Sequence, residues 1–318
     1  WLKPFWLQLR TWEVPSLRAM MLTEELSWYR QLAAAAVSVG NKVGSKVTSP
    51  IKDLGKRVHP EGKKPHSDTR EWRAFELADA MEQGLAPGLT TSFIEALSEE
   101  AEDRRLIVQR APDRQSFILT EDEGKELMIA KASCEGKRFE LFIASGDDRP
   151  KALGPAFILE SNEHKDNWKL RSRCEVCESR GKRQCGVREL ASMTQYMEKV
   201  GEGSAFCMDV AIPEVCPDGS SCAVWCDVCG STASSKGVTE LTVRRPRWNA
   251  RQKSLTLDFR GRCSMASAKN FQMEVVEKPG KVNFLFGKVR ENKFVLDLLH
   301  PLGTVQAFAA ALSSMHWK

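Results

Sequence analysis

Hydrophobic and polar residues alternate along many short stretches between Leu106 and Leu299, and acidic or glycine-containing turns separate these stretches. Alternation with a period of two is the pattern of a strand that buries one face. We predict strands at Ser116–Thr120, Glu126–Ala130, Phe139–Ser145, Ala156–Ser161, Ala205–Ile212, Thr239–Arg245, Ser254–Arg260, Phe271–Val276, Asn283–Val289 and Lys293–Leu299. Short strands at this spacing are typical of an antiparallel sandwich or barrel.

The segment Leu302–Met315 breaks this alternation, because it is apolar almost all round. A helix without a polar face must be buried on every side. At about 1.5 Å per residue it would span roughly 21 Å, the depth of one small domain. The simplest arrangement is a mainly β fold, a closed antiparallel β-barrel with this C-terminal helix buried at its centre.

The residues before the barrel follow a different pattern. Helix-forming residues at Thr23–Val37, Asp68–Gln83 and Thr91–Arg105 predict three helices. Ser38–His66 is rich in Gly, Ser, Pro and Lys and has few large apolar residues, which favours a flexible basic linker. We therefore divide the chain into a helical and flexible basic region, 1–105, and a barrel domain, 106–318.

Composition narrows the class of protein only slightly. The chain has 318 residues, with 47 Lys+Arg and 42 Asp+Glu, so its formal net charge is +5. A charge this small does not by itself predict nucleic-acid binding. No apolar run approaches the roughly 18 residues that a transmembrane helix needs, so we expect no transmembrane segment.

Cysteine spacing suggests a metal. Cys174 and Cys177 form one Cys-x-x-Cys pair, and Cys226 and Cys229 form a second. Each such turn presents two thiolates to one ion, and two turns complete a tetrahedral zinc site. We expect a structural zinc at these four cysteines, while unbridged thiols and disulfide or redox pairs remain open alternatives. Further cysteines in the same region are Cys185, Cys216 and Cys222, the first and last of them spare ligand candidates.

No catalytic arrangement is apparent, and we expect no enzyme activity. The five histidines occur in unrelated contexts, without a metal-binding or Glu-paired spacing. The sequence also lacks a phosphate-cradling Gly-rich loop and a nucleophile-elbow motif.

Several strings in the last quarter of the chain follow one another in a fixed order. They are Pro246–Asn249, Leu255–Arg262, Ala266–Gln272, Phe286–Val289, Pro301–Leu302, Gln306–Ala309 and Ala311–Ser314. In this order and with these gaps they resemble the tubby C-terminal domain family. Upstream, Phe117–Lys125 is similar to the early hairpin of the family, Leu141–Ser145 to its next strand, and Arg188–Ala191 with Tyr196 to a helix-bearing region.

The resemblance implies a twelve-stranded barrel around a central apolar helix. It also implies a non-enzymatic, membrane-associated adaptor or signalling protein that binds phosphatidylinositol bisphosphate. Family members bind this lipid through a Lys-x-Arg pair on one strand and an Arg from the next helix region, and such cations suit a highly charged headgroup. We accordingly expect a cytoplasmic protein at the inner face of the plasma membrane, with the nucleus also open.

The resemblance leaves two alignments for the Lys-x-Arg pair. The first uses Lys169 and Arg171, which stand in a literal copy of the family's Lys-Leu-Arg-Ser string. In either alignment Arg188 matches the Arg of the helix region. Lys169, Arg171 and Arg188 are therefore the candidate lipid-binding residues.

The second alignment matches Ser161 with the penultimate residue of the motif and makes the segment from Trp168 the next strand. Its spacing fits the family better, but it puts Ile158 and Glu160 at the two cationic positions. Because Glu160 would repel phosphate, this alignment implies a lipid site that is lost or rebuilt. The rival hypothesis is therefore a zinc-stabilised module for protein or nucleic-acid interaction that binds no lipid.

Overall fold

The computed structural model describes residues 87–122, 124–133, 135–144, 154–174, 187–226 and 237–316. A division of the chain into two units falls between Lys64 and Pro65, and every described residue belongs to the second unit. The helices predicted at Thr23–Val37 and Asp68–Gln83, and the basic linker between them, lie outside the described residues.

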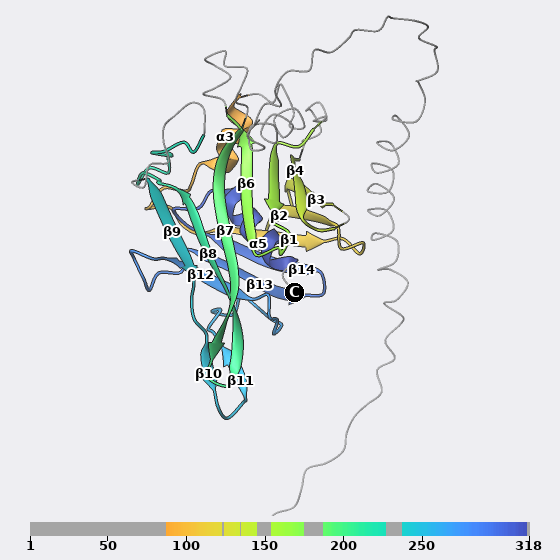
Figure 1. The fold of residues 1–318 in the computed structure, drawn as a ribbon, viewed down its shortest axis with the longest axis vertical. Coiled ribbons are helices and arrows are strands. Elements are labelled where there is room, and N and C mark those ends of the chain that lie inside the picture. The colour runs from red at the N-terminus through yellow and green to blue at the C-terminus, as the bar shows by residue number, and fades with distance from the viewer. Residues whose placement is uncertain are drawn as a thin grey trace, which may run out of the picture. The chain divides into compact units, whose positions relative to one another are not determined.

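Twelve strands form a closed antiparallel barrel, which confirms the predicted fold (Figure 1). The order around the barrel is β1-β14-β13-β12-β9-β8-β7-β6-β5-β4-β3-β2. The strands are β1 Arg104–Arg110, β2 Ser116–Glu121, β3 Glu126–Ala132, β4 Arg138–Ile143, β5 Phe157–Ser161, β6 Asn167–Arg173, β7 Val187–Val200, β8 Gly203–Pro213, β9 Val238–Val243, β12 Phe271–Val275, β13 Phe284–Arg290 and β14 Lys293–Leu298. A separate two-stranded sheet consists of β10 Arg247–Asn249 and β11 Ser254–Thr256.

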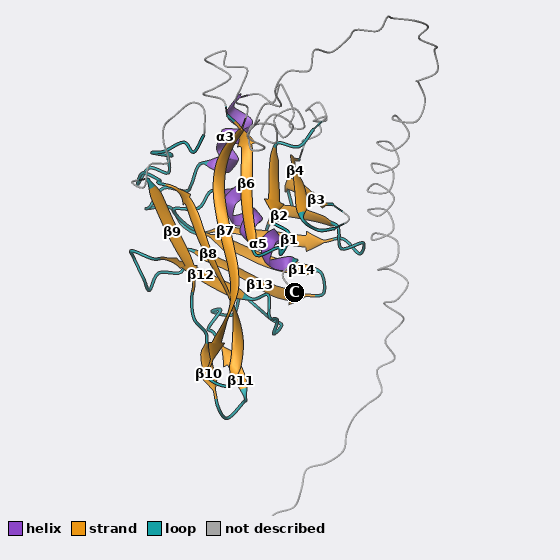
Figure 2. Ribbon diagram, in the orientation of Figure 1, coloured by secondary structure: helices purple, strands orange, loops and turns teal. Residues whose placement is uncertain are grey.

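The helix α5, Thr304–Met315, runs inside this barrel, as the purple helix among the orange strands in Figure 2 shows. Every residue from Thr304 to Ser314 is buried, as the all-round apolar pattern predicts. The helix begins two residues later than expected, because Gly303 caps it. The Gly303 N–H donates to the Gln306 side-chain oxygen at 2.8 Å, and a Cβ at Gly303 would lie 2.2 Å from the Ile94 carbonyl oxygen.

The helix predicted at Thr91–Arg105 is wrong in its extent. The observed helix α3 spans Pro87–Ile94, and the chain is already in strand β1 at Arg104. Tertiary contacts end the helix early, since Ala96 forms a β-bridge with Gly303 and donates its N–H to the Gly219 carbonyl at 3.1 Å. The helix is an integral part of the domain because Phe93 and Ile94 belong to the barrel core.

The helix-bearing region expected near Arg188–Ala191 is also wrong, because these residues lie in the long strand β7. Backbone pairing with β6 on one side and β8 on the other holds the segment extended. This pairing satisfies the backbone groups of the segment from both sides, which a helix at the same place would not allow.

The strand predicted at Ser254–Arg260 ends early, at Thr256, and a turn follows. In this turn the Arg260 N–H donates to the Asp258 carboxylate at 2.8 Å, and Gly261 adopts a φ of +75°. An added Cβ at Gly261 would contact nothing within 4 Å, so its backbone conformation, rather than crowding, explains glycine here.

Candidate functional site

The family resemblance directs attention to the outer surface of β4, β5, β6 and β7. On β6, Leu170 is fully buried in the core, whereas Lys169 and Arg171 lie on the other side of the strand. Pairing across strands brings Glu160 opposite Lys169. Because paired residues project to the same side of a sheet, a set of charges gathers outside the barrel. We call the charged face the set Arg138, Glu140, Glu160, Lys169, Arg171 and Glu189.

Every member of the charged face forms an ion pair with another member. Lys169 Nζ lies 2.8 Å from a Glu189 oxygen, and Arg171 Nη1 lies 3.0 Å from a Glu160 oxygen. The other oxygen of Glu160 lies 3.7 Å from Arg138, which also pairs with Glu140 at 3.2 Å. The three cations are therefore matched by three carboxylates of the same surface.

Exposure differs between these pairs. The Lys169 side chain is 52% exposed and its partner Glu189 is 23% exposed, whereas Arg171 and Glu160 are 24% and 15% exposed. Exposed pairs contribute about 0–1 kcal/mol and are screened by salt. The Lys169 pair is consequently the easier one to open. Arg138 also keeps a buried Nε that makes no hydrogen bond with the described part of the protein.

Arg188 does not lie beside Lys169 and Arg171, the other two predicted lipid-binding residues. A register shift in the β6–β7 pairing places Arg171 opposite Glu189 and Ser172 opposite Arg188. Ser172 is buried on the inner side, and the Arg188 Nε donates to its hydroxyl at 3.1 Å. Lys169 and Arg171 therefore share one face of the sheet, while Arg188 lies on the opposite side.

The strand boundaries agree with the second alignment of the Lys-x-Arg motif. Strand β5 ends at Ser161, and β6 follows it over Asn167–Arg173. In that alignment Ile158 and Glu160 occupy the cationic positions. Ile158 is fully buried against Val187. Glu160 forms ion pairs with Arg138 and Arg171.

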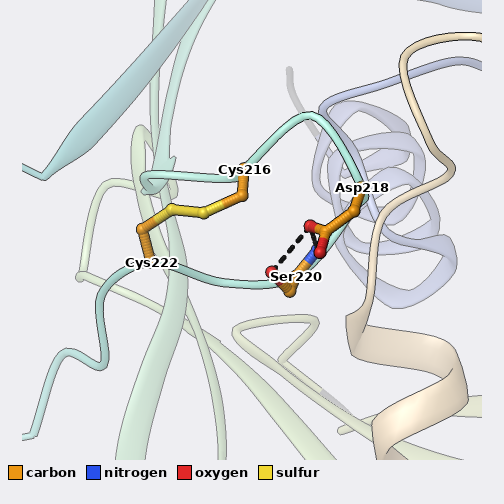
Figure 3. The surroundings of a disulfide bond; sticks show 4 residues. All are labelled: Cys216, Asp218, Ser220 and Cys222. Atoms are coloured by element: carbon orange, nitrogen blue, oxygen red, sulfur yellow. Dashed lines mark hydrogen bonds between the residues drawn. A yellow bond between two sulfur atoms is a disulfide. The ribbon is translucent and has the colours of Figure 1, made fainter.

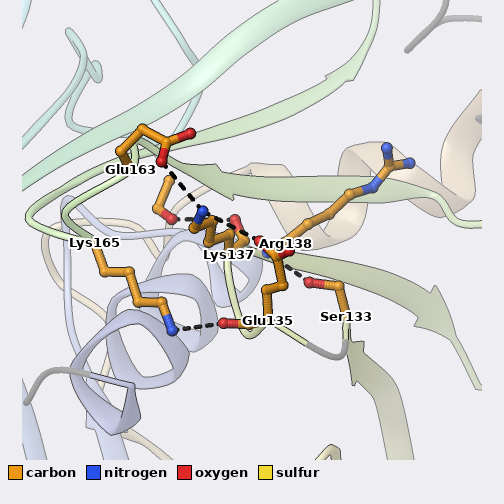
Figure 4. A network of polar contacts seen from close by, with 7 residues as sticks. Ser133, Glu135, Lys137, Arg138, Glu163 and Lys165 are labelled. Atoms are coloured by element: carbon orange, nitrogen blue, oxygen red, sulfur yellow. Dashed lines mark hydrogen bonds and ion pairs between the residues drawn. The ribbon is translucent and has the colours of Figure 1, made fainter.

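Two turns fix the edge of the charged face, as Figure 4 shows. Lys165, in the β5–β6 turn, donates to the Glu135 carbonyl in the β3–β4 turn at 2.6 Å. Lys137 lies 3.1 Å from the Glu135 carboxylate and 3.4 Å from the Glu163 carboxylate, and these two acids raise its pKa. The turns thus hold β4 and β5 in a common register on this side of the barrel.

The sequence did not single out three members of the charged face, Arg138, Glu140 and Glu189. Each lies at an outward position of a strand beside an oppositely charged residue of a neighbouring strand: Arg138 beside Glu160, Glu140 beside Lys131, and Glu189 beside Arg171. The sequence does show charged residues at alternate positions of the predicted strands. Their partners can be identified only when the order and register of the strands are known. Of the cations that follow Arg171 in the sequence, Arg173 is on β6, whereas Arg180, Lys182 and Arg183 lie outside the described residues.

Two of the four predicted zinc ligands flank the beginning of β7. Cys174 is buried and directly follows Arg173, which pairs with Val187. Cys226 is buried and directly follows Trp225, whose carbonyl accepts the Glu189 N–H at 2.9 Å. Their partners Cys177 and Cys229, and the spare candidate Cys185, lie outside the described residues. Within the described ranges, no group of three or more His, Cys, Asp or Glu side chains is placed to hold a metal ion.

A disulfide joins Cys216 and Cys222, so Cys222 is not a spare metal ligand (Figure 3). Inside the loop that it closes, Asp218 accepts hydrogen bonds from the N–H and the hydroxyl of Ser220, at 2.9 and 2.7 Å. The loop packs against the chain after α3, where a Cβ at Gly219 would lie 2.2 Å from the Ala96 carbonyl oxygen. The disulfide alternative, left open for the whole cysteine cluster, therefore holds for this pair.

No helix in the described part of the chain is long and apolar enough to cross a membrane.

Comparisons with known proteins agree with the architecture. The model of the Tub family matches residues 127–317. Tubby protein homolog 1 of Caenorhabditis briggsae is 42% identical over 78 residues, which are 24% of this chain and 18% of that protein. Tubby-related protein 1 of Mus musculus is 43% identical over 83 residues, 26% of this chain and 15% of that protein. The matches thus span less than a fifth of the length of these curated relatives.

A solved protein from Arabidopsis thaliana is 14% identical and has a TM-score of 0.32, with 70% of this chain and 91% of that chain covered. The family model covers more than half of the chain and includes ten of the twelve barrel strands, all except β1 and β2, together with α5. The chain belongs to the Tub family.

Proposed function

We propose that this chain is a non-catalytic, tubby-like adaptor of signalling that associates with the cytoplasmic surface of the plasma membrane. Its ligand would be a phosphoinositide headgroup bound at the charged face. The observation that carries this proposal is the side-by-side placement of Lys169 and Arg171 on the outer surface of β6, near Arg138. Three cations on one surface can chelate a multiply charged phosphate.

The internal ion pairs tune this binding rather than prevent it. An exposed pair is weak, and a headgroup with several phosphate charges can displace the Glu189 carboxylate from Lys169. The buried Nε of Arg138 is a further donor that a phosphate oxygen would satisfy. Glu160 opposes binding, because it holds both Arg138 and Arg171 and adds a negative charge. We expect weaker lipid affinity than three unpaired cations would give.

The test is co-sedimentation of the full chain with phosphatidylcholine vesicles, with and without phosphatidylinositol bisphosphate. Replacing both Lys169 and Arg171 by Gln should weaken binding to the phosphoinositide vesicles about thirtyfold, at about 1 kcal/mol per cation. A matched control replaces Arg251 and Lys253, two exposed cations of the β10–β11 turn, by Gln. Arg188→Gln should have a smaller effect, because Arg188 lies on the other side of the sheet.

A reciprocal variant sharpens the test. Glu160→Gln releases two cations and removes one negative charge, so it should strengthen binding to the same vesicles. Equal sedimentation with and without the phosphoinositide, in the original chain and in this variant, would contradict lipid binding.

The second candidate is a protein-interaction module on the same barrel that binds no lipid. The pairing of Glu160 and Glu189 with the local cations favours it, because it neutralises the surface internally. The two candidates differ in the vesicle test, since this one predicts no dependence on the phosphoinositide.

We further propose that Cys174, Cys177, Cys226 and Cys229 bind a structural zinc, as their spacing suggests. The positions of Cys174 and Cys226 beside the first residues of β7 support this, because both pairs then start from one edge of the barrel. Metal analysis of the purified chain should give one zinc per molecule, and Cys226→Ser should remove it. Cys263 lies outside the cysteine-rich stretch Cys174–Cys229. Cys263→Ser is therefore the control, and this variant should retain the metal. A chain without zinc would refute the proposal.

A further inference from the structure

The loop of residues 216–222, between β8 and β9, is closed at its two ends by the Cys216–Cys222 disulfide. Cys222 is exposed and Cys216 is half-buried, so thiols in solution can reach the bond. Disulfides are rare in cytosolic proteins, and those that form there are usually transient, catalytic or redox-sensing. At the proposed cytoplasmic location, a bond of this kind is one that the cell can break and re-form.

The disulfide-closed loop supports the chain that leaves α3. Ala96 donates its N–H to the Gly219 carbonyl at 3.1 Å, and Glu99 donates its N–H to the Pro217 carbonyl at 2.8 Å. Both acceptors lie inside the loop, which Figure 3 shows next to the ribbon of this segment. The position of the segment 95–99 therefore depends on the position of the loop.

The same segment also contacts the entry to α5. Ala96 forms a β-bridge with Gly303, and the Leu97 carbonyl oxygen lies 3.1 Å from the His300 Nδ1 atom. The segment is consequently held between the disulfide-closed loop on one side and the start of the central helix on the other. A change in the loop thus reaches the chain that joins α3 to the barrel.

The short helix α3 needs such support. It has eight residues, whereas isolated helices of fewer than about 12–15 residues are marginal in water. Its last two residues, Phe93 and Ile94, pack into the barrel core. A disulfide restricts the conformations that its loop can adopt, and this restriction disappears when the bond breaks. The two carbonyl acceptors are then held less firmly, so α3 should open more often.

Hydrogen bonds within the loop limit the size of this effect. The Cys216 N–H donates to the Ser220 carbonyl at 2.8 Å, and the Gly219 N–H donates to the Cys216 carbonyl at 2.9 Å. Asp218 accepts two further hydrogen bonds from Ser220. These bonds do not require the disulfide. Reduction should therefore cause more frequent local opening of α3 rather than unfolding of the barrel.

We propose that the Cys216–Cys222 disulfide is a redox-sensitive clamp, which holds α3 on the barrel when oxidised and lets α3 open when a dithiol reductant breaks the bond. The clamp goes beyond the proposed phosphoinositide function, because it uses the loop after β8 and the chain after α3 rather than the charged face. Its use in the cell rests on the proposed cytoplasmic location, whereas its effect on α3 does not.

The chemical step is thiol–disulfide exchange. One thiolate of the dithiol attacks the exposed Cys222 sulfur, the S–S bond breaks, and Cys216 leaves as a thiolate. The second thiol of the reductant then displaces Cys222 from the mixed disulfide. Two electrons and two protons pass to the protein, which gains two thiols, and the dithiol becomes a disulfide. Exchange with an oxidised disulfide reverses the reaction.

The test is amide hydrogen exchange of the full chain, measured by mass spectrometry before and after treatment with dithiothreitol. Reduction should speed exchange of the amides in residues 91–99 about tenfold, because Ala96 and Glu99 lose firmly held acceptors. Amides of β2 should exchange at the same rate in both states. The readout uses no lipid, so its failure would leave the phosphoinositide proposal standing.

Variants separate this bond from the other cysteines that dithiothreitol meets. The double variant Cys216→Ser, Cys222→Ser should show the fast exchange with and without the reductant. Cys263→Ser is the matched control and should respond as the original chain does. Circular dichroism establishes that each variant is folded.

A measurement without variants completes the test. In buffers of glutathione and glutathione disulfide, the exchange rate of residues 91–99 should change at the same ratio at which Cys222 becomes open to alkylation. Equal exchange in the oxidised and reduced chain would overturn the proposal. A response to dithiothreitol that persists in the double variant, or a Cys222 that alkylates fully without reductant, would also overturn it.

Discussion

The central helix and the charged face are held by different physical forces, although only the barrel wall separates them. Around α5, Phe308 and Leu312 are fully buried, and their stabilisation comes from apolar area removed from water. On the outside, Lys169, Arg171 and Glu160 contribute through ion pairs that remain partly hydrated. Removal of one interior side chain leaves a cavity, whereas removal of one outer charge leaves a solvated partner. The interior should therefore tolerate little change, while the charged face can change its ligand without loss of fold.

The largest effect should follow from a cavity at the centre. Phe308→Ala should lower the free energy of unfolding by about 3–5 kcal/mol, because a fully buried aromatic side chain disappears from a close-packed site. Urea denaturation of the full chain measures it, and Met197→Ala, at an exposed position, is the control. A loss below about 1 kcal/mol would show that α5 does not carry the core.

Overpacking a contact just outside the barrel wall should lower the free energy of unfolding by a smaller amount. A Cβ at Gly287 would lie 1.7 Å from the Cys263 sulfur, so Gly287→Ala should cost about 1–3 kcal/mol through overpacking. Adding Cys263→Ala should recover more than half of that loss, because the sulfur is the first obstacle. The double-mutant cycle in urea measures this coupling, and strictly additive effects of the two changes would contradict it.

The end of α5 should make stability depend on pH. Burial lowers the pKa of His316 to about 4, and the charges of Lys165, Lys269 and Arg110 lower it further in the same direction. The ring lies beside Phe139, with centroids 5.0 Å apart. The unfolded chain, with a histidine pKa of about 6.5, binds the proton first, so stability is complete above about pH 6.5 and falls as the pH drops toward 4.

His316→Phe should remove this part of the pH dependence. We expect the original chain to lose about 1–2 kcal/mol more than the variant between neutral pH and pH 4, a value reduced for the partial exposure of the ring. Urea denaturation at several pH values measures the difference. Parallel curves for the two proteins would mean that His316 titrates normally in the folded state.

The smallest effect should come from the charged face. Lys169→Gln should change the free energy of unfolding by no more than about 0.5 kcal/mol, because its pair with Glu189 is exposed. The same urea measurement applies, repeated at high salt, where the difference should vanish. A loss as large as that of Gly287→Ala would erase the contrast between interior and surface.

The same contrast explains which features the sequence could reveal. The buried helix and most strands follow from the distribution of apolar residues, so Leu302–Met315 and the alternating stretches predict a barrel. Strand β7 escaped prediction, because its extended form depends on β6 and β8 rather than on its own residues. The end of α3 at Ile94 likewise depends on contacts with Gly219 and Gly303.

The candidate site was less accessible from the sequence than the fold. The Lys-Leu-Arg-Ser string indicated Lys169 and Arg171, but their neutralisation by Glu189 and Glu160 depends on which strands are adjacent. The separation of Arg188 from them arises from a single register shift in the β6–β7 pairing. A shift of one residue turns a side chain to the opposite face of a strand, and the sequence pattern alone does not locate it.

Closure of the barrel requires its first and last strands to pair, and these strands are synthesised far apart in time. Strand β1 pairs with β14, so Arg104 finds its partner Leu298 only after nearly the whole domain has been synthesised. The helix that fills the interior is translated later still. Pairings this distant in sequence slow folding, and the apolar inner faces of the early strands stay exposed on the ribosome meanwhile. We therefore expect nascent chains that stop before residue 304 to depend on chaperones, and released full-length chains to fold in one late step.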